Sequence, residues 1–375
     1  MTCWASYVPS KRIMGDLVYT LIQQTHHAEP AIRKQSAVEL GKIDLSSHRQ
    51  DAIRALCALL NHEHLDVREA AKGALIGIGG EDVVKALVSY LTSSSTTALN
   101  YAIEILSQKG SDGIDHILAL LASKNHDVRK FGCDILGNLQ YVESVYDLIE
   151  LLNDPHINVA IAAGEALGKL GNPEAVPHLI RALQHPDTWM RCIAAEALGK
   201  IGDPRALEAF LAIPSDEEPI VVYTAIKAMS HLRDEHVVPY MLSILRSNSM
   251  FASSVAQAIE HLAAGQGETI YHQVKASGVT TPFVCLLSSE HVDVLRSAIN
   301  LVKKLHLREA IQSLRQLLKH ADDEVVSEAI EALVGLDDPR NITPVFQQLL
   351  TQTNSINRKH LFQQALSSLQ NEQEA

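Results

Sequence analysis

The chain has 375 residues, 46% of them hydrophobic but only 5% aromatic, a balance that favours Leu, Ile, Val and Ala packed between helices. Lys and Arg number 32 against 44 Asp and Glu, giving a net charge of −12, which argues against nucleic acid as a partner because phosphate would be repelled. No apolar run reaches the ~18 residues of a membrane span, and the scattered cysteines form no C-x-x-C pair. We expect a cytoplasmic protein without a cofactor.

Residues 1–27 predict an N-terminal capping segment. The stretch from Ile13 to Gln24 is rich in apolar residues and indicates a helix. Such an element suits the start of a repeat array, because a stack of repeats needs terminal elements with one polar side.

A pattern near 31 residues long recurs over residues 28–350. NVAIAAGEALGKLGNPEAVPHLIRAL from Asn158 can be laid over TWMRCIAAEALGKIGDPRALEAFLAI from Thr188. Each copy closes its first predicted helix with an apolar residue, except one degenerate copy that has Lys109 there. The closing residues are Ile43, Ile78, Leu139, Leu170, Ile201, Leu232, Leu262, Leu305 and Leu336.

Each copy predicts a helical hairpin. In the first helix, residues such as Ala163, Ala166 and Leu167 are apolar or small at one helical spacing, so they share a face. Small residues there let two helices approach closely. The turn Gly171 to Pro173 ends the first helix and opens the second. The second helix carries its own apolar stripe, as in Val176, Leu179, Ile180 and Leu183.

The segments DVREAAKGALIGIG, HDVRKFGCDILGNL and MRCIAAEALGKIGDPRAL resemble the HEAT repeat, in particular the short variety called phycobilisome-lyase HEAT-like repeats. The resemblance covers roughly Ala28 to Leu350. It implies an all-α fold, a right-handed α-α superhelix or solenoid of about ten helical hairpins. It specifies function weakly, because that family mixes bilin lyases with adaptors of unrelated roles.

Charged residues sit where several first helices begin. Asp66 and Arg68, like Asp127 and Arg129, put a carboxylate near a helix N-terminus, where unpaired backbone N–H groups stabilise negative charge. The arginine two residues later is free to reach a neighbouring repeat. We therefore predict a polar ladder between repeats.

Histidines recur in the same turns, at His62, His64, His126, His156 and His185. Neighbouring repeats are roughly 8–10 Å apart, whereas Zn–N bonds are about 2.0–2.1 Å long. Equivalent histidines therefore cannot share one ion unaided. We expect no metal site and interpret these histidines as polar residues of helix-start turns.

The eighth repeat is longer than the others, with an irregular insertion at about 265–285. Two interpretations remain open. The second helix is either Glu268 to Val274, or it begins at Thr281 and leaves Gly267 to Gly278 as an insert. The later start packs better, because it carries Phe283, Val284 and Leu287. Insertions in solenoids project from one face, either as binding elements or as tolerated excursions.

Residues 351–375 predict a C-terminal capping helix, near Ile356 to Leu369, and a polar tail. The helix would cover the open end of the stack, as the N-terminal segment does at the other end.

The second helices supply the candidate partner-binding residues. Stacked second helices commonly line the concave face of such solenoids, so a partner would meet the residues between their buried positions. The patch mixes acidic, aromatic, His and Arg side chains, a composition suited to a polar interface with aromatic anchors. The candidates are His116, Tyr146, Asp147, Glu150, His178, Arg181, Glu208 and Tyr240.

These patterns predict a non-catalytic scaffold or adaptor that holds a protein or peptide partner on the concave face. No Gly-rich phosphate loop, G-x-S-x-G elbow or H-E-x-x-H helix occurs, and Cys57, Cys133 and Cys192 fall on expected helices where core packing explains them. The acidic balance favours a basic segment in the partner. The alternative, implied by the resemblance alone, is a bilin-lyase-like or chromophore-handling subunit, an enzyme attaching a chromophore to a phycobiliprotein-type partner.

Overall fold

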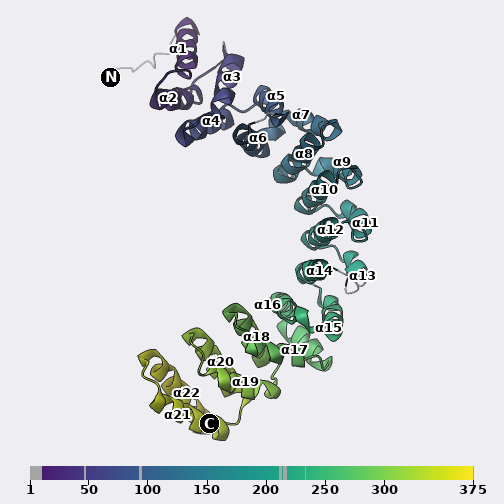
Figure 1. Ribbon diagram of the computed structural model, residues 1–375, viewed down its shortest axis with the longest axis vertical. Helices are drawn as coiled ribbons and strands as arrows, with labels where there is room; N and C mark the ends of the chain where they lie inside the picture. The colour runs from purple at the N-terminus through teal and green to yellow at the C-terminus, as the bar shows by residue number, and fades with distance from the viewer. Residues whose placement is uncertain are drawn as a thin grey trace, which may run out of the picture. The chain divides into compact units, whose positions relative to one another are not determined.

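A computed structural model describes residues 11–45, 48–92, 95–210, 213, 218–232 and 234–374. Within these ranges the chain is built of α-helices and short 3-10 helices, and no strand occurs. The helices pair into hairpins from α2–α3 to α20–α21, with α1 before them and α22 after them (Figure 1). This confirms the predicted all-α solenoid.

The first compact unit comprises Met1–Ala182. It begins with α1, Lys11–Gln24, which lies in the predicted N-terminal segment. Its first helices are α2 Pro30–Leu40, α4 Leu65–Ile78, α6 Thr96–Lys109, α8 His126–Leu139 and α10 Ile157–Leu170. Its second helices are α3 Arg49–Leu59, α5 Glu81–Val88, α7 Ile114–Leu118, α9 Val145–Leu151 and α11 Val176–Ala182.

The second compact unit comprises Leu183–Ala375. It ends with α22, Ile356–Glu374, in the predicted C-terminal segment. Its first helices are α12 Thr188–Ile201, α14 Pro219–His231, α16 Ala252–Ala276, α18 Val292–Lys304 and α20 Asp323–Leu336. Its second helices are α13 Ala206–Phe210, α15 Val238–Ser247, α17 Thr281–Cys285, α19 Ile311–Leu317 and α21 Pro339–Gln352.

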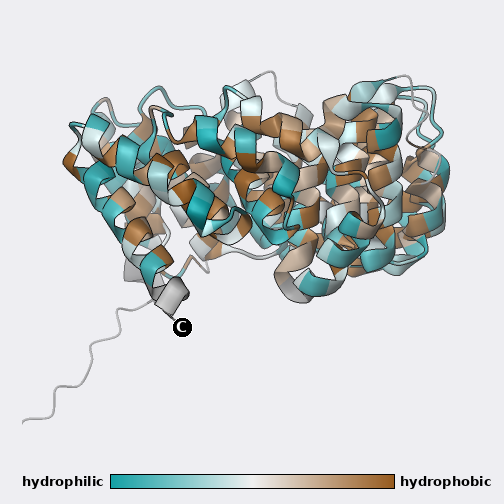
Figure 2. Ribbon diagram, turned by 90° about the horizontal axis from the view of Figure 1, so that it is seen from below, coloured by the Kyte–Doolittle hydropathy of each residue, from teal (hydrophilic) through white to brown (hydrophobic). Residues whose placement is uncertain are grey.

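The core lies between the two helix rows of each unit. Ala163, Ala166 and Leu167 of α10 are buried, and so are Val176 and Leu179 of α11, as the stripes predicted. Apolar and polar residues alternate around the helices accordingly (Figure 2). Each hairpin thus buries one face of both helices, and successive hairpins continue the core.

Small residues bring neighbouring first helices into backbone contact. A Cβ added to Gly137 of α8 would lie 2.9 Å from the Cα of Ala166 in α10, and one added to Gly199 of α12 would lie 2.8 Å from the Cα of Ala228 in α14. Helix separation follows the size of the side chains at the contact. The prediction that small residues allow close approach of the first helices is confirmed.

This close packing decides which row faces inward. Within the first unit, the row formed by α4, α6, α8 and α10 lies on the inner side of the bend, and the second helices lie on the outer side (Figure 1). Successive helices in a row with small contact residues sit closer together, so the stack curves toward that row. The expectation that second helices line the concave side is therefore wrong within this unit.

The turn between α10 and α11 follows the predicted chemistry. Gly171 ends α10 with φ +65°, a left-handed conformation that glycine adopts without steric cost. The side chain of Asn172 then accepts a hydrogen bond from the backbone N of Glu174, and Pro173 opens a short 3-10 helix before α11.

The irregular eighth repeat differs from expectation in one respect. The second helix, α17, begins at Thr281 with Phe283 buried, which confirms the later of the two starts. The extra residues do not project as a loop, because α16 runs unbroken from Ala252 to Ala276. Ile270 and Val274 of this extension are buried, and their burial outweighs the low helix propensity of Gly267.

Candidate functional site

The turns between hairpins share a capping arrangement. In eight of the described turns, a side chain three residues before the helix accepts a hydrogen bond from the backbone N two residues later. For His62 the acceptor is Nδ1, 3.1 Å from the N of His64. Such bonds satisfy donors that the helix leaves free. The same role is played by His27, Ser123, Asp154, His185, Ser289, His320 and Thr353. Of the histidines that recur in these turns, His62 and His185 are therefore turn caps. His64 and His156 occupy the N-cap position without a side-chain cap bond, and His126 is the first residue of α8.

Arginines clamp these turns from the following helix. Nη1 of Arg68 donates to the carbonyl of His62 at 2.6 Å, and Arg191 binds the carbonyl of His185 in the same way at 3.0 Å. These two contacts join each arginine to the turn that precedes its own helix, and they do not reach a neighbouring repeat. The predicted polar ladder between repeats is therefore confirmed only in part.

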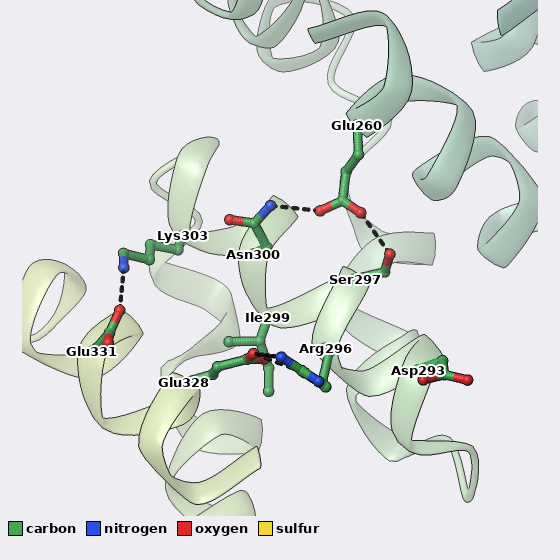
Figure 3. A pocket seen from close by; sticks show the side chains of 9 residues that line it. All are labelled: Glu260, Asp293, Arg296, Ser297, Ile299, Asn300, Lys303, Glu328 and Glu331. Carbon is green, nitrogen blue, oxygen red and sulfur yellow. Dashed lines mark hydrogen bonds and ion pairs between the residues drawn. The ribbon is translucent and has the colours of Figure 1, made fainter. Parts of the chain in front are cut away.

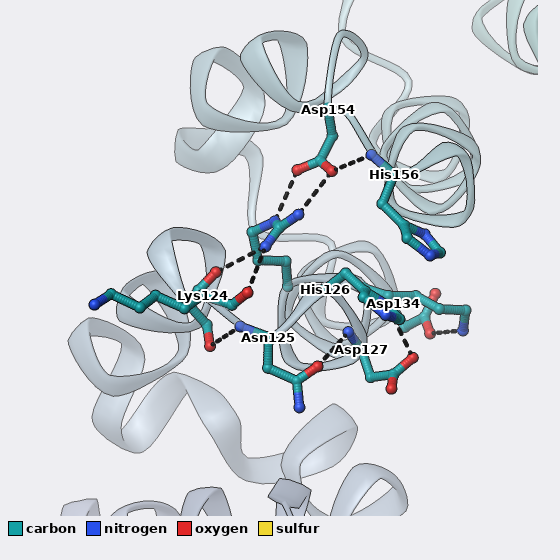
Figure 4. A network of polar contacts seen from close by, with 10 residues as sticks. Lys124, Asn125, His126, Asp127, Asp134, Asp154 and His156 are labelled. Atoms are coloured by element: carbon teal, nitrogen blue, oxygen red, sulfur yellow. Dashed lines mark hydrogen bonds and ion pairs between the residues drawn. The ribbon is translucent and has the colours of Figure 1, made fainter.

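Arg129 joins two repeats. Its Nη1 donates to the carbonyl of Ser123, and its Nε and Nη2 donate to both carboxylate oxygens of Asp154, in the next turn, at 2.7 and 2.8 Å (Figure 4). The Asp154 side chain is only 4% exposed. The bidentate pair holds the pKa of Asp154 below its usual value. The rings of His126 and His156 stack beside it, with centroids 3.7 Å apart.

The structure places six predicted site residues on successive second helices of the first unit. Tyr146 on α9 is 65% exposed, and its neighbours Asp147 and Glu150 are exposed. The others are partly committed to contacts. His116 on α7 lies 3.1 Å from Glu81 of α5. On α11, Nη2 of Arg181 lies 2.7 Å from Nδ1 of His178.

The remaining two predicted residues lie in the second unit. Glu208 on α13 is exposed and Tyr240 on α15 is half-buried. The eight residues thus belong to second helices, as predicted, but they are divided between the two units. Their role in partner binding stays a prediction.

A trough that sequence reasoning missed lies on the first helices of the second unit. It spans α16, α18 and α20 and has a volume of about 440 Å³. Figure 3 shows Glu260 reaching from α16 to α18, where its carboxylate accepts hydrogen bonds from Oγ of Ser297 at 2.5 Å and Nδ2 of Asn300 at 2.6 Å. On the far side, Arg296 and Lys303 of α18 pair with carboxylates of α20.

The trough exists because the glycine–alanine contact is missing at this junction. Counting back from the residue that closes each first helix, Glu260 occupies the position of Gly137, and Leu301 of the next helix occupies the position of Ala166. Two larger side chains cannot accept the backbone contact found between α8 and α10. The helices therefore leave space, which Glu260 partly fills with a polar bridge.

The charges of the trough are unequal. Arg296 lies 2.8 Å from Glu328 and 2.9 Å from Glu324, and Lys303 lies 2.9 Å from Glu331. Two further carboxylates, those of Glu260 and Asp293, have no cationic partner among the described residues. The trough therefore carries an excess of negative charge facing solvent.

A second pocket adjoins the trough on the same row. It lies between α14 and α16 and has a volume of about 320 Å³. The rings of His231 and His261 meet edge to face across it, with centroids 5.1 Å apart, and Tyr223, Lys227 and Gln257 line the rest. The pocket thus adds aromatic groups to a face that carries charged and amide groups in the trough.

The buried cysteines do not add a reactive centre to this surface. Cys57 and Cys133 are buried, and burial raises the pKa of each thiol to about 12. Cys192 is buried as well. Within the described ranges, no three His, Cys, Asp or Glu side chains are placed to hold a metal ion. In the same part of the chain, no helix is both long and apolar enough to cross a bilayer.

Hairpins that stack through buried stripes, with capped turns between them, define an all-α helical-repeat protein. HEAT repeats match residues 18–107, 114–191, 177–262 and 281–367, so the chain belongs to the HEAT repeat family. No match is found among the curated proteins. Among solved structures, the crystal structure of an engineered protein is similar, at 20% identity and a TM-score of 0.35, over 94% of this chain and 98% of that one.

Proposed function

We propose that this protein is a non-catalytic scaffold that holds a protein or peptide partner on the exposed face of its first-helix row. The observation that carries the proposal is the trough on α16, α18 and α20, with its adjoining pocket. The trough is lined mainly by charged and amide side chains, and the pocket adds aromatic rings, with each drawing its lining from successive repeats. Such a composition suits a polar interface with a few anchoring residues.

The fold supports this function in a second way. Successive repeats bury their apolar stripes against one another, so stability resides in the core and the exposed positions are released from it. Asn300 and Asp293 are exposed, whereas their neighbours Leu295 and Ile299 are buried. Exposed positions can therefore be specialised for a partner without loss of the fold.

The predicted patch on the second helices of the first unit is the competing surface. Exposed Tyr146 flanked by Asp147 and Glu150 is favoured as an anchor because tyrosine is enriched at interfaces. The alternative chromophore-handling role has no comparable support in these contacts. It would be favoured if the experiment below captured a linear tetrapyrrole.

Site-specific photocrosslinking tests the proposal. A benzophenone amino acid is placed at Asn300 in the first-helix row, and in a second variant at Glu150 on α9. Both positions are exposed, so each variant should fold. After irradiation in lysate of the source cell, we expect crosslinked protein from Asn300 and little from Glu150.

Three results bear on the competing ideas. Crosslinks from Glu150 alone would show that the partner binds the second-helix patch and not the first-helix row. Equal yields with a denatured control would contradict specific binding by either surface. A crosslinked linear tetrapyrrole in place of a protein would favour the chromophore-handling role.

A further inference from the structure

We propose that the first-helix face of the second unit binds an extended partner segment that carries an apolar residue at one end and Lys or Arg at the other. This inference rests on the proposed function and adds the chemistry and spacing of the partner. It follows from how one repeat position changes along the row.

The position twelve residues before the closing residue is apolar in three successive repeats of this unit. Trp189 of α12, Ile220 of α14 and Met250 before α16 occupy it. Their side chains are 64%, 43% and 62% exposed. Single exposed apolar residues are common on proteins, whereas their recurrence at one position of three successive repeats is the pattern of an interaction surface.

In the next two repeats the same position becomes acidic. Asp293 of α18 and Glu324 of α20 occupy it. Asp293 lines the trough and has no hydrogen bond or ion pair among the described residues, while Glu324 is paired with Arg296. The row therefore passes from an apolar half to an acidic half within one continuous set of helices.

The acidic half selects the charge of its occupant. Glu260 and Asp293 are the carboxylates of the trough that lack a cationic partner. A Lys or Arg side chain in the trough would be attracted by both carboxylates, and Arg could form two parallel hydrogen bonds with either one. An acidic segment would be repelled by the same groups, so the complementary partner is basic.

The spacing between the two halves predicts the length of the segment. Successive helices in such a row are roughly 8–10 Å apart, so Ile220 on α14 and Asp293 on α18, two steps apart, are separated by about 16–20 Å. An extended chain advances about 3.3–3.6 Å per residue. The apolar anchor and the basic residue of the partner should therefore be about five residues apart.

Fluorescein-labelled synthetic peptides of twelve residues test this inference by anisotropy. The probe has Trp at one end and two Arg five positions away, separated by Ser and Thr, and is made in both chain directions. Three controls replace Arg by Gln, replace Trp by Ser, or bring Trp and Arg next to each other. We expect the probe in one direction to bind about tenfold more tightly than each control.

Protein variants locate the binding. Asp293→Asn should weaken binding of the probe, and the double variant with Glu260→Gln should weaken it about tenfold. Neither variant should change the affinity for the Gln control peptide. Asp293 has no partner to lose, so the single variant keeps its fold. The matched control changes two exposed carboxylates elsewhere, Glu143→Gln and Glu174→Gln, and should bind the probe as the unaltered protein does.

Several outcomes would overturn the inference. One is equal affinity for the probe and its Gln control. Another is an unchanged affinity for the probe in the Asp293 and Glu260 variants. A third is equal affinity for the probe and for the peptide in which Trp and Arg are next to each other. Photocrosslinks from Asn300 to a cellular protein, together with failure of every basic peptide, would leave the proposed scaffold function standing and reject only the chemistry assigned to its partner.

Discussion

Replacing Gly137 with alanine should reveal whether backbone contact between first helices holds the stack together. In an open helical site, Gly→Ala stabilises by roughly 0.5–1 kcal/mol through helix propensity. At Gly137 the new Cβ would lie 2.9 Å from the Cα and Cβ of Ala166. Ordinary contact begins near 3.4 Å, so α8 and α10 must separate by about half an ångström.

The magnitude follows from the balance of these two effects. Inserting a methyl group into a packed contact costs about 1–3 kcal/mol, which exceeds the gain in propensity. We expect Gly137→Ala to lower the free energy of unfolding by about 1–2 kcal/mol. Gly73 of α4 is the matched control, because an added Cβ there meets nothing within 4 Å. Gly73→Ala should raise the free energy of unfolding by about 0.5–1 kcal/mol.

Urea unfolding followed by circular dichroism measures both variants. The curves are fitted with a nearest-neighbour model, because repeats in a stack unfold in partly independent steps. Hydrogen exchange of α8 and α10 amides shows whether the loss is local to their interface. A Gly137→Ala protein as stable as the unaltered chain would refute the backbone contact and the explanation of the bend that depends on it.

Three further predictions concern the turns and the cysteines. Asp154→Ala leaves Arg129 without its buried carboxylate partner and should lower the free energy of unfolding by about 2–4 kcal/mol. The pKa of Asp154 is lowered in the folded state, so its contribution to stability is present above the unfolded pKa and is lost as pH falls through the lower folded pKa. Burial and the charge of Arg33 lower the pKa of His62 in the folded state. The free energy of unfolding should therefore fall when pH drops below the ordinary His value of about 6.5. His62→Asn keeps a hydrogen-bond acceptor in the turn and should reduce that loss, as urea titrations between pH 7 and 5 would show. Exposed Cys285 should react with iodoacetamide at pH 8 while Cys57, with a pKa of about 12, stays unmodified until the chain unfolds, as mass spectrometry would show.

The candidate site divides into a part that sequence could reach and a part that it could not. Exposure of second-helix positions such as Tyr146, Asp147 and Glu150 follows from the sequence, because burial follows the helical period, whereas Tyr240 is half-buried. The sequence also contained a signal for the trough, since Glu260 and Leu301 break the glycine–alanine pair. That signal is recognised only when it is known that these two positions of successive first helices contact each other. Their contact is known from the tertiary structure and not from the sequence.

Sequence alone determined the local structure of this protein. Helices, hairpin turns and the repeat period follow from interactions between residues a few positions apart, such as the stripe in α10 and the turn at Gly171. Tertiary structure decided which row of helices packs more closely, where the row opens, and how far α16 extends. These features depend on side-chain volume across helix interfaces, as between Gly137 and Ala166, and on burial that overrides local propensity, as at Ile270 and Val274.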